Sequence, residues 1–84
     1  MKIYDLVKTM NELKLGKYQH LKGNLYEVIG VARHSETLEE LVVYRALYNS
    51  DKFGPNSLWV RPKRMFMENV VVDGKDMPRF RYVR

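Results

Sequence analysis

The stretch VARHSETLEELVVYRALY, residues 31–48, concentrates residue types that serve in catalysis. A serine nucleophile needs a histidine within reach that a carboxylate orients, and His34, Ser35 and Glu36 are consecutive here. Consecutive residues of a strand point to opposite faces of its sheet, so this adjacency argues against a catalytic dyad. The pattern instead predicts a polar turn, in which Ser35 and Thr37 bond to the backbone and the glutamates are solvated.

A metal site or a pair of catalytic carboxylates is also poorly supported. His20 and His34 are the only histidines, and with a glutamate they would suffice for a two-histidine metal site, but they lie on separate predicted strands. Glu27 is the best single candidate for a buried acid or base, yet the alternation of its strand favours an outward position. We therefore predict no catalytic residue, no metal ligand and no cofactor, and a metal-dependent hydrolase is the least favoured function.

Basic and aromatic residues interleave near the C-terminus. Trp59 and Arg61 share one face of a predicted strand, and Arg79 and Arg81 form a ladder on another. An exposed aromatic ring beside arginines can stack on a base while the arginines pair with phosphate. The alternative is that Trp59 belongs to the core and the arginines form a solvated outer face.

The elements that must position these residues are one helix and about five strands. The helix is indicated over residues 1–14 by apolar residues at helical spacing, namely Ile3, Leu6, Val7, Met10 and Leu13. Beyond Gly16 the period changes to about two. Further strands are expected at residues 18–21, 25–34, 58–61, 66–72 and 79–83, with a loop at 49–57 and a helical turn at 63–65. Asp73-Gly74 predicts a hairpin turn between the last two strands.

Residues 41–48 fit two elements. Thr37 with Glu40 three residues later resembles a helix capping box, whereas Leu-Val-Val-Tyr is strand-like and bounded by polar turns. The strand is favoured. If it forms a hairpin with the preceding strand, Arg45 would lie opposite Gly30, where the missing side chain leaves space for a ligand or for the arginine itself.

The pairs expected in that hairpin are His34 with Leu41, Ala32 with Val43 and Gly30 with Arg45. Tyr44 would then lie on the other face from Arg45. His34 would lie at the rim of the sheet.

Together these elements predict a mainly β fold. Residues 16–84 would form one small, curled, antiparallel barrel of the SH3-like or OB-like type. The helix of residues 1–14 would plug one open end or pack against another subunit. A chain of 84 residues has room for a single domain.

Composition narrows the setting of the protein. The chain has no cysteine, which makes a reducing cytoplasmic location the default expectation. Its apolar runs are too short to span a membrane. The net charge is +5, and residues 61–84 supply +4 of it (seven Lys or Arg against three Asp or Glu). This local positive charge favours an anionic partner.

Three stretches together resemble a known family. They are GKYQHLKGNLYEVIGVARHSETLEELVVYRALY (residues 16–48), LWVRPKRMF (residues 58–66) and VDGKDMPRF (residues 72–80). Over about residues 16–82 the chain is similar to the small bacterial and phage family called domain of unknown function 1653. The resemblance implies no activity, because none is assigned to that family.

The function predicted first is that of a non-enzymatic binding domain for an anionic, base-containing ligand, either a nucleic acid or a free nucleotide. A phage-type protein that sequesters a nucleotide is one form of this hypothesis. The expected ligand-binding residues are Trp59, Arg61, Arg45, Tyr44, Arg79, Arg81 and His34. The alternative is a structural or protein-interaction module that forms a homo-oligomer through the N-terminal helix.

Overall fold

The computed structural model describes residues 13–84. Within this range the chain forms nine strands and one short helix. They are β1 (Gly16–His20), β2 (Leu25–Arg33), β3 (Glu40–Ala46), β4 (Asn49–Ser50), β5 (Gly54–Pro55), β6 (Leu58–Pro62), α2 (Lys63–Phe66), β7 (Asn69–Val72), β8 (Lys75–Pro78) and β9 (Phe80–Tyr82). The mainly β class predicted from the sequence is confirmed.

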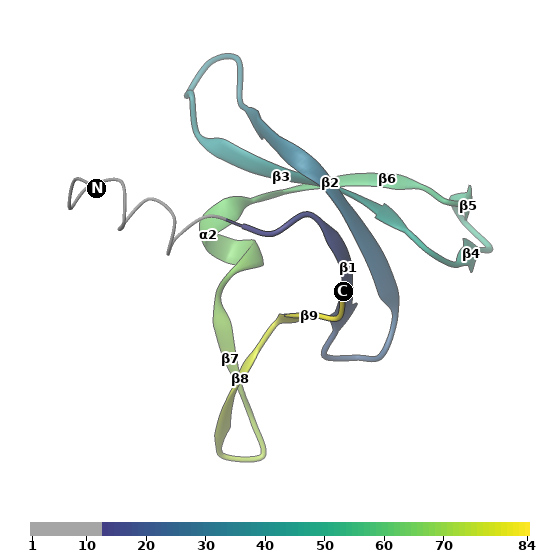
Figure 1. The fold of residues 1–84 in the computed structure, drawn as a ribbon, viewed down its shortest axis with the longest axis vertical. Helices are drawn as coiled ribbons and strands as arrows, with labels where there is room; N and C mark the ends of the chain where they lie inside the picture. Colours follow the sequence, from purple (N-terminus) through teal and green to yellow (C-terminus); the bar gives the residue numbers. More distant parts are fainter. Residues whose placement is uncertain (1–12) are drawn as a thin grey trace.

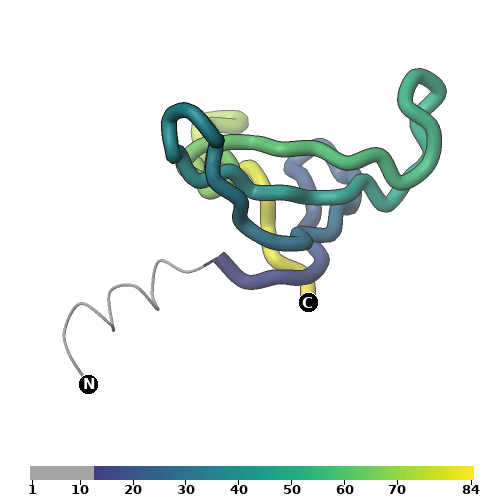
Figure 2. Tube along the Cα trace, turned by 90° about the horizontal axis from the view of Figure 1, so that it is seen from above, coloured from purple at the N-terminus to yellow at the C-terminus, as the bar shows by residue number. Residues whose placement is uncertain are grey.

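Five of the strands form one antiparallel sheet in the order β6-β3-β2-β1-β9 (Figure 1). The hairpins β4–β5 and β7–β8 are separate and project from this sheet (Figures 1 and 2). The end strands β6 and β9 are not paired with each other in the described part of the chain, so a closed barrel is not confirmed.

The predicted N-terminal helix falls mainly on residues outside the described range. Leu13 and Lys14, the last two residues of the predicted helix, are not helical. Leu13 packs against the core. In residues 13–84 no helix is long and apolar enough to cross a membrane.

The core lies on one face of the sheet, called the inner face below. Its buried residues are Tyr18, Val28, Val42, Tyr44, Ala46, Phe66 and Phe80. Phe66 reaches this face from α2, and its ring stacks on that of Phe80 with centroids 4.1 Å apart. Aromatic rings bury large apolar areas, so this cluster stabilises a domain that has little other interior.

The 41–48 segment is a strand, β3, as favoured, but its register differs from the prediction. Arg45 pairs with Glu27, and Gly30 pairs with Val43, so the expected position of Arg45 opposite Gly30 is wrong. Pairing begins only at Arg33 with Glu40, and it slips at a bulge between Val28 and Gly30. Period-two alternation cannot reveal such an inserted residue.

The C-terminal strands also differ from the prediction. Asp73 and Gly74 form a two-residue turn with φ of 50° and 78°, as the hairpin signal predicts. The strand that follows at once is β8, with the sequence KDMP, whose polar composition and proline gave no strand signal. The predicted partner, β9, pairs instead with β1.

The segment predicted as a loop at residues 49–57 contains the small β4–β5 hairpin. The predicted helical turn is α2, and it includes Phe66, which the prediction assigned to a strand.

Candidate functional site

A cleft of about 330 Å³ opens on the inner face, between the sheet and the β4–β5 hairpin. We call it the aromatic cleft. Its lining residues are Tyr26, Tyr44, Tyr48, Ser50, Phe53, Trp59 and Arg61. Cavities of this size and composition, largely aromatic with a few polar groups, are typical of small-molecule sites.

The strand register places three of the predicted site residues in this cleft. Tyr44 on β3 pairs with Trp59 on β6, and Val42 pairs with Arg61. Directly paired residues project from the same face of a sheet, so Trp59 and Arg61 share the inner face with Tyr44. Trp59 and Arg61 therefore lie on one face of β6, as the period of two predicts.

The Trp59 side chain is half-buried, and its indole ring contacts Ser57 and Phe53. Its indole Nε1 donates a hydrogen bond of 2.9 Å to Ser57 Oγ. Its ring meets that of Phe53, from the β4–β5 hairpin, edge to face with centroids 5.0 Å apart. Trp59 also packs against the core and lines the aromatic cleft, so it is partly buried and not an outward-facing side chain.

A pair of hydrogen-bonded tyrosines lines the same cleft as Trp59. Tyr26 and Tyr48 share a hydrogen bond of 2.9 Å between their hydroxyl oxygens. Burial, and next the hydrogen bond with Tyr48, raise the pKa of Tyr26 to about 12. The Tyr26 hydroxyl therefore stays neutral near pH 7, and the hydroxyls of Tyr26 and Tyr48 offer hydrogen-bond donors and acceptors on an apolar wall.

Arg61 supplies the positive charge of the cleft. Its Nε donates a long hydrogen bond of 3.4 Å to the Tyr44 hydroxyl, and its guanidinium carbon lies 5.5 Å from the centre of the Phe80 ring. No carboxylate of residues 13–84 forms an ion pair with Arg61. A half-buried guanidinium without a carboxylate partner is suited to bind an anion.

The other predicted site residues lie outside the cleft. Arg45 pairs with Glu27 at 3.4 Å, through side chains that are both more than 40% exposed. Arg79 pairs with Glu68 at 2.8 Å, and Arg81 donates to the Gln19 side chain at 2.6 Å.

His34 serves the β2–β3 turn. Its Nδ1 accepts hydrogen bonds from the backbone N–H groups of Glu36 and Thr37, at 3.1 and 3.3 Å. The structure therefore gives this residue the turn role that the sequence favoured over catalysis.

His20, which the sequence suggests only as a metal ligand, lies near Arg61. Its ring meets Phe80 edge to face with centroids 4.9 Å apart. Burial, and then the positive charges of Arg61, Lys22 and Arg79, lower the pKa of His20. The sequence gives no signal for this position, because it depends on β9 pairing with β1.

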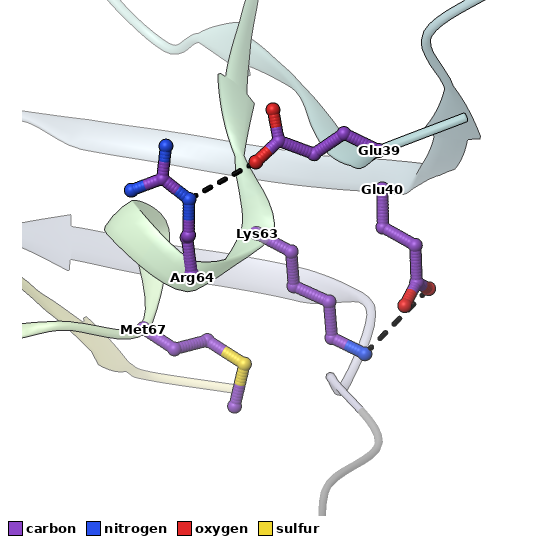
Figure 3. A pocket seen from close by; sticks show the side chains of 5 residues that line it. All are labelled: Glu39, Glu40, Lys63, Arg64 and Met67. Carbon is purple, nitrogen blue, oxygen red and sulfur yellow. Dashed lines mark hydrogen bonds and ion pairs between the residues drawn. The ribbon is translucent and has the colours of Figure 1, made fainter. Parts of the chain in front are cut away.

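A larger hollow of about 380 Å³ lies between α2 and the start of β3, and Figure 3 shows its lining. Arg64 pairs there with Glu39 at 3.0 Å, and Lys63 pairs with Glu40 at 3.8 Å (Figure 3). Because each cation already has an acidic partner, this hollow has no charge left for a ligand, and the aromatic cleft is the better site.

No group of three or more histidine, aspartate or glutamate side chains within residues 13–84 could hold a metal ion. His20 and His34 each use Nδ1 to accept backbone N–H groups of their own turns. The described part of the chain therefore offers no geometric support for a metal-dependent hydrolase.

Comparison with known proteins identifies the family. The model of a family described as "Protein of unknown function (DUF1653)" matches residues 16–82. The chain is also similar to the crystal structure of a protein of that family from Bordetella bronchiseptica, with 36% identity and a TM-score of 0.77. This match covers 88% of the present chain and 91% of the other. A search of curated proteins gave no significant match. With four fifths of its length matched by the family model, the chain belongs to the DUF1653 family.

Proposed function

We propose that the protein is a non-enzymatic binding domain whose aromatic cleft takes a nucleotide. The observation that carries this proposal is Arg61, a half-buried arginine with no carboxylate partner in residues 13–84, beside Trp59 in one cleft. The base would stack on the indole among the tyrosines, and the guanidinium would pair with phosphate oxygens.

A free nucleotide is favoured over a nucleic acid strand. A strand needs a continuous positive groove that follows several phosphates. Three arginines that could contribute to it, Arg45, Arg64 and Arg79, are each paired with a glutamate, and Arg81 is bonded to the Gln19 side chain. Arg61 alone faces the cleft, so the charge distribution suits one phosphate group.

We also propose how the cleft treats its ligand and how the observed sheet relates to the predicted barrel. The one serine of residues 13–84 that lines the cleft, Ser50, uses its Oγ to accept backbone N–H groups of its own turn, and no histidine or carboxylate of this range lines the cleft beside it. The cleft would therefore hold its ligand unchanged, as a sequestering protein does. We interpret the curled sheet as an open form of the small barrel predicted from the sequence, with the ligand on its inner face.

The first test is isothermal titration calorimetry with the four common nucleoside 5′-monophosphates. We expect stoichiometric binding of at least one, and Arg61→Gln should lower its affinity about 10- to 100-fold, because a charged hydrogen-bond donor to phosphate is lost. Arg45→Gln is the matched control, since it removes an arginine from the opposite face and only an exposed ion pair.

Equal loss in the two variants would show that net charge, and not the cleft, determines binding. Binding of a single-stranded oligonucleotide with a steep salt dependence, and of no monophosphate, would replace the nucleotide by a nucleic acid.

A second candidate is the protein-interaction module, favoured by the face of the sheet opposite the core. Leu58 and Val60 on β6 are each 61% exposed there, beside Val43 on β3. A row of exposed apolar residues on an edge strand is suited to pair with another chain. Light scattering of wild type and Val60→Lys tests it: a dimer that Val60→Lys dissociates would support this candidate, and a monomer at all concentrations would reject self-association.

A further inference from the structure

The Phe80 ring contacts two basic side chains, Arg61 and His20, that lie far apart in the sequence. The Phe66 ring stacks on this ring with centroids 4.1 Å apart, and the Arg61 guanidinium carbon lies over it, 5.5 Å from the ring centre. His20 meets the same ring at 4.9 Å. Arg61 arrives from β6 and His20 from the end of β1, so the pairing of β9 with β1 brings both to one ring.

The hydrogen bond at one nitrogen of His20 determines what the other can do. Nδ1 accepts the backbone N–H of Lys22 at 3.1 Å. In the neutral imidazole the proton must then be on Nε2, which makes Nε2–H a hydrogen-bond donor. Burial and the neighbouring cations lower the pKa of His20, so this neutral tautomer is the form present near pH 7.

The charges around His20 come from three elements and are all positive. They belong to Arg61 on β6, Lys22 in the β1–β2 turn and Arg79 just before β9. Arg81 on β9 borders a hollow of about 230 Å³ that His20 also lines. The Glu68 carboxylate is bonded to Arg79 at 2.8 Å. An anion near His20 would therefore be attracted without displacing a carboxylate from Arg61 or Arg81.

We propose that His20 is the second donor of a phosphate subsite, in which the Arg61 guanidinium and the His20 Nε2–H group bind one phosphate beside the Phe80 ring. This subsite rests on the proposed nucleotide function and makes it more specific. The ligand class we assign to the subsite is a nucleotide that ends in a phosphate monoester, which can accept from both donors and carries more negative charge toward these basic residues than a phosphodiester does.

The test uses inorganic phosphate and AMP as probes, at pH 7.5 and constant ionic strength set with sodium chloride, with binding followed by NMR chemical shifts. His20→Ala should weaken binding of both probes about 10- to 100-fold, because a donor to a charged oxygen is lost. His20→Gln should bind nearly as wild type, since a glutamine amide can place its N–H close to the Nε2 position. A merely structural histidine would show no such rescue.

His34→Ala is the matched control. His34 also accepts backbone N–H groups of its turn through Nδ1, but it lies in the β2–β3 turn and not at the Phe80 ring. We expect this variant to bind both probes as wild type does.

The outcomes separate the subsite from the proposed function. Inorganic phosphate has no base, so its His20-dependent binding would support the subsite even if no nucleotide stacks on Trp59. Affinity of His20→Ala equal to wild type, failure of His20→Gln to rescue, or no saturable phosphate binding would each overturn the subsite. AMP binding that depends on Arg61 and Trp59 but not on His20 would overturn the subsite and leave the nucleotide function standing.

Discussion

Single side chains in this protein serve the fold and the candidate site together. Trp59 packs against the core and also lines the aromatic cleft. Arg61 bonds to the Tyr44 hydroxyl and lies over the Phe80 ring, which fixes its guanidinium before any ligand arrives. A side chain that is already ordered loses less entropy on binding, so this arrangement favours affinity.

His20 makes stability depend on pH. Its pKa is lowered in the folded chain, so below the ordinary value of 6.5 the unfolded chain binds a proton at this residue that the folded chain resists. The stabilising contribution of neutral His20 is therefore present above pH 6.5 and is lost as the pH falls below it. Urea unfolding at about pH 7.5 and about pH 5 should show a larger loss of unfolding free energy for wild type than for His20→Gln.

The carboxylates titrate in both proteins and so cancel in this comparison. An equal loss of unfolding free energy in wild type and variant would mean that burial and the neighbouring cations do not lower the pKa of His20 in solution.

At the scale of elements, the start of β1 is fixed by contact with the C-terminus. Gly16 has a φ of 127°, and a Cβ built on it would lie 2.6 Å from the Arg84 carbonyl oxygen. Lys17 N–H donates to that same oxygen at 2.9 Å. Gly16→Ala should lower the unfolding free energy by more than about 1 kcal/mol, because it strains the backbone and displaces this contact.

Gly30→Ala is the control for this prediction. Nothing lies within 4 Å of a Cβ built on Gly30, and its φ is outside the left-handed region. Its unfolding free energy should stay within about 0.5 kcal/mol of wild type. Similar values for both variants would contradict the account of how β1 is held at the C-terminus.

The elements that could be predicted from the sequence are those with strong local signals. A high content of Val, Ile and Tyr predicts β2 and β3, and Asp73-Gly74 predicts a hairpin turn. The bulge between Val28 and Gly30 has no such signal, and it moves Arg45 opposite Glu27. Of the candidate site, the shared face of Trp59 and Arg61 was predictable from strand periodicity, whereas the position of Tyr44 beside Trp59 comes from the pairing of β3 with β6.

The members of the site that escaped prediction come from tertiary pairing. Tyr26, Tyr48 and Phe53 join the aromatic cleft through the β2–β3 pairing and the β4–β5 hairpin. His20 approaches Arg61 only because β9 pairs with β1 across the length of the chain. Nothing in the local sequence reports such contacts.

For the whole molecule, the distribution of charge says more about the proposed ligand than the net charge does. The net charge is +5, but Arg45, Lys63, Arg64 and Arg79 are each paired with a glutamate. The unpaired guanidinium of Arg61 lies instead inside an aromatic cleft. This distribution of charge supports the proposed ligand, one small anion with an aromatic ring, over a polyanion.

The most direct test of this account uses Trp59, the only tryptophan in the chain. Its intrinsic fluorescence reports on the aromatic cleft alone, and stacking of a base on the indole should change it. We predict a saturable change of Trp59 fluorescence on titration with AMP, and a much weaker response to adenosine, which lacks the phosphate that Arg61 would bind. Equal responses to AMP and adenosine, or no response to any of the four nucleoside monophosphates, would contradict the proposed nucleotide site.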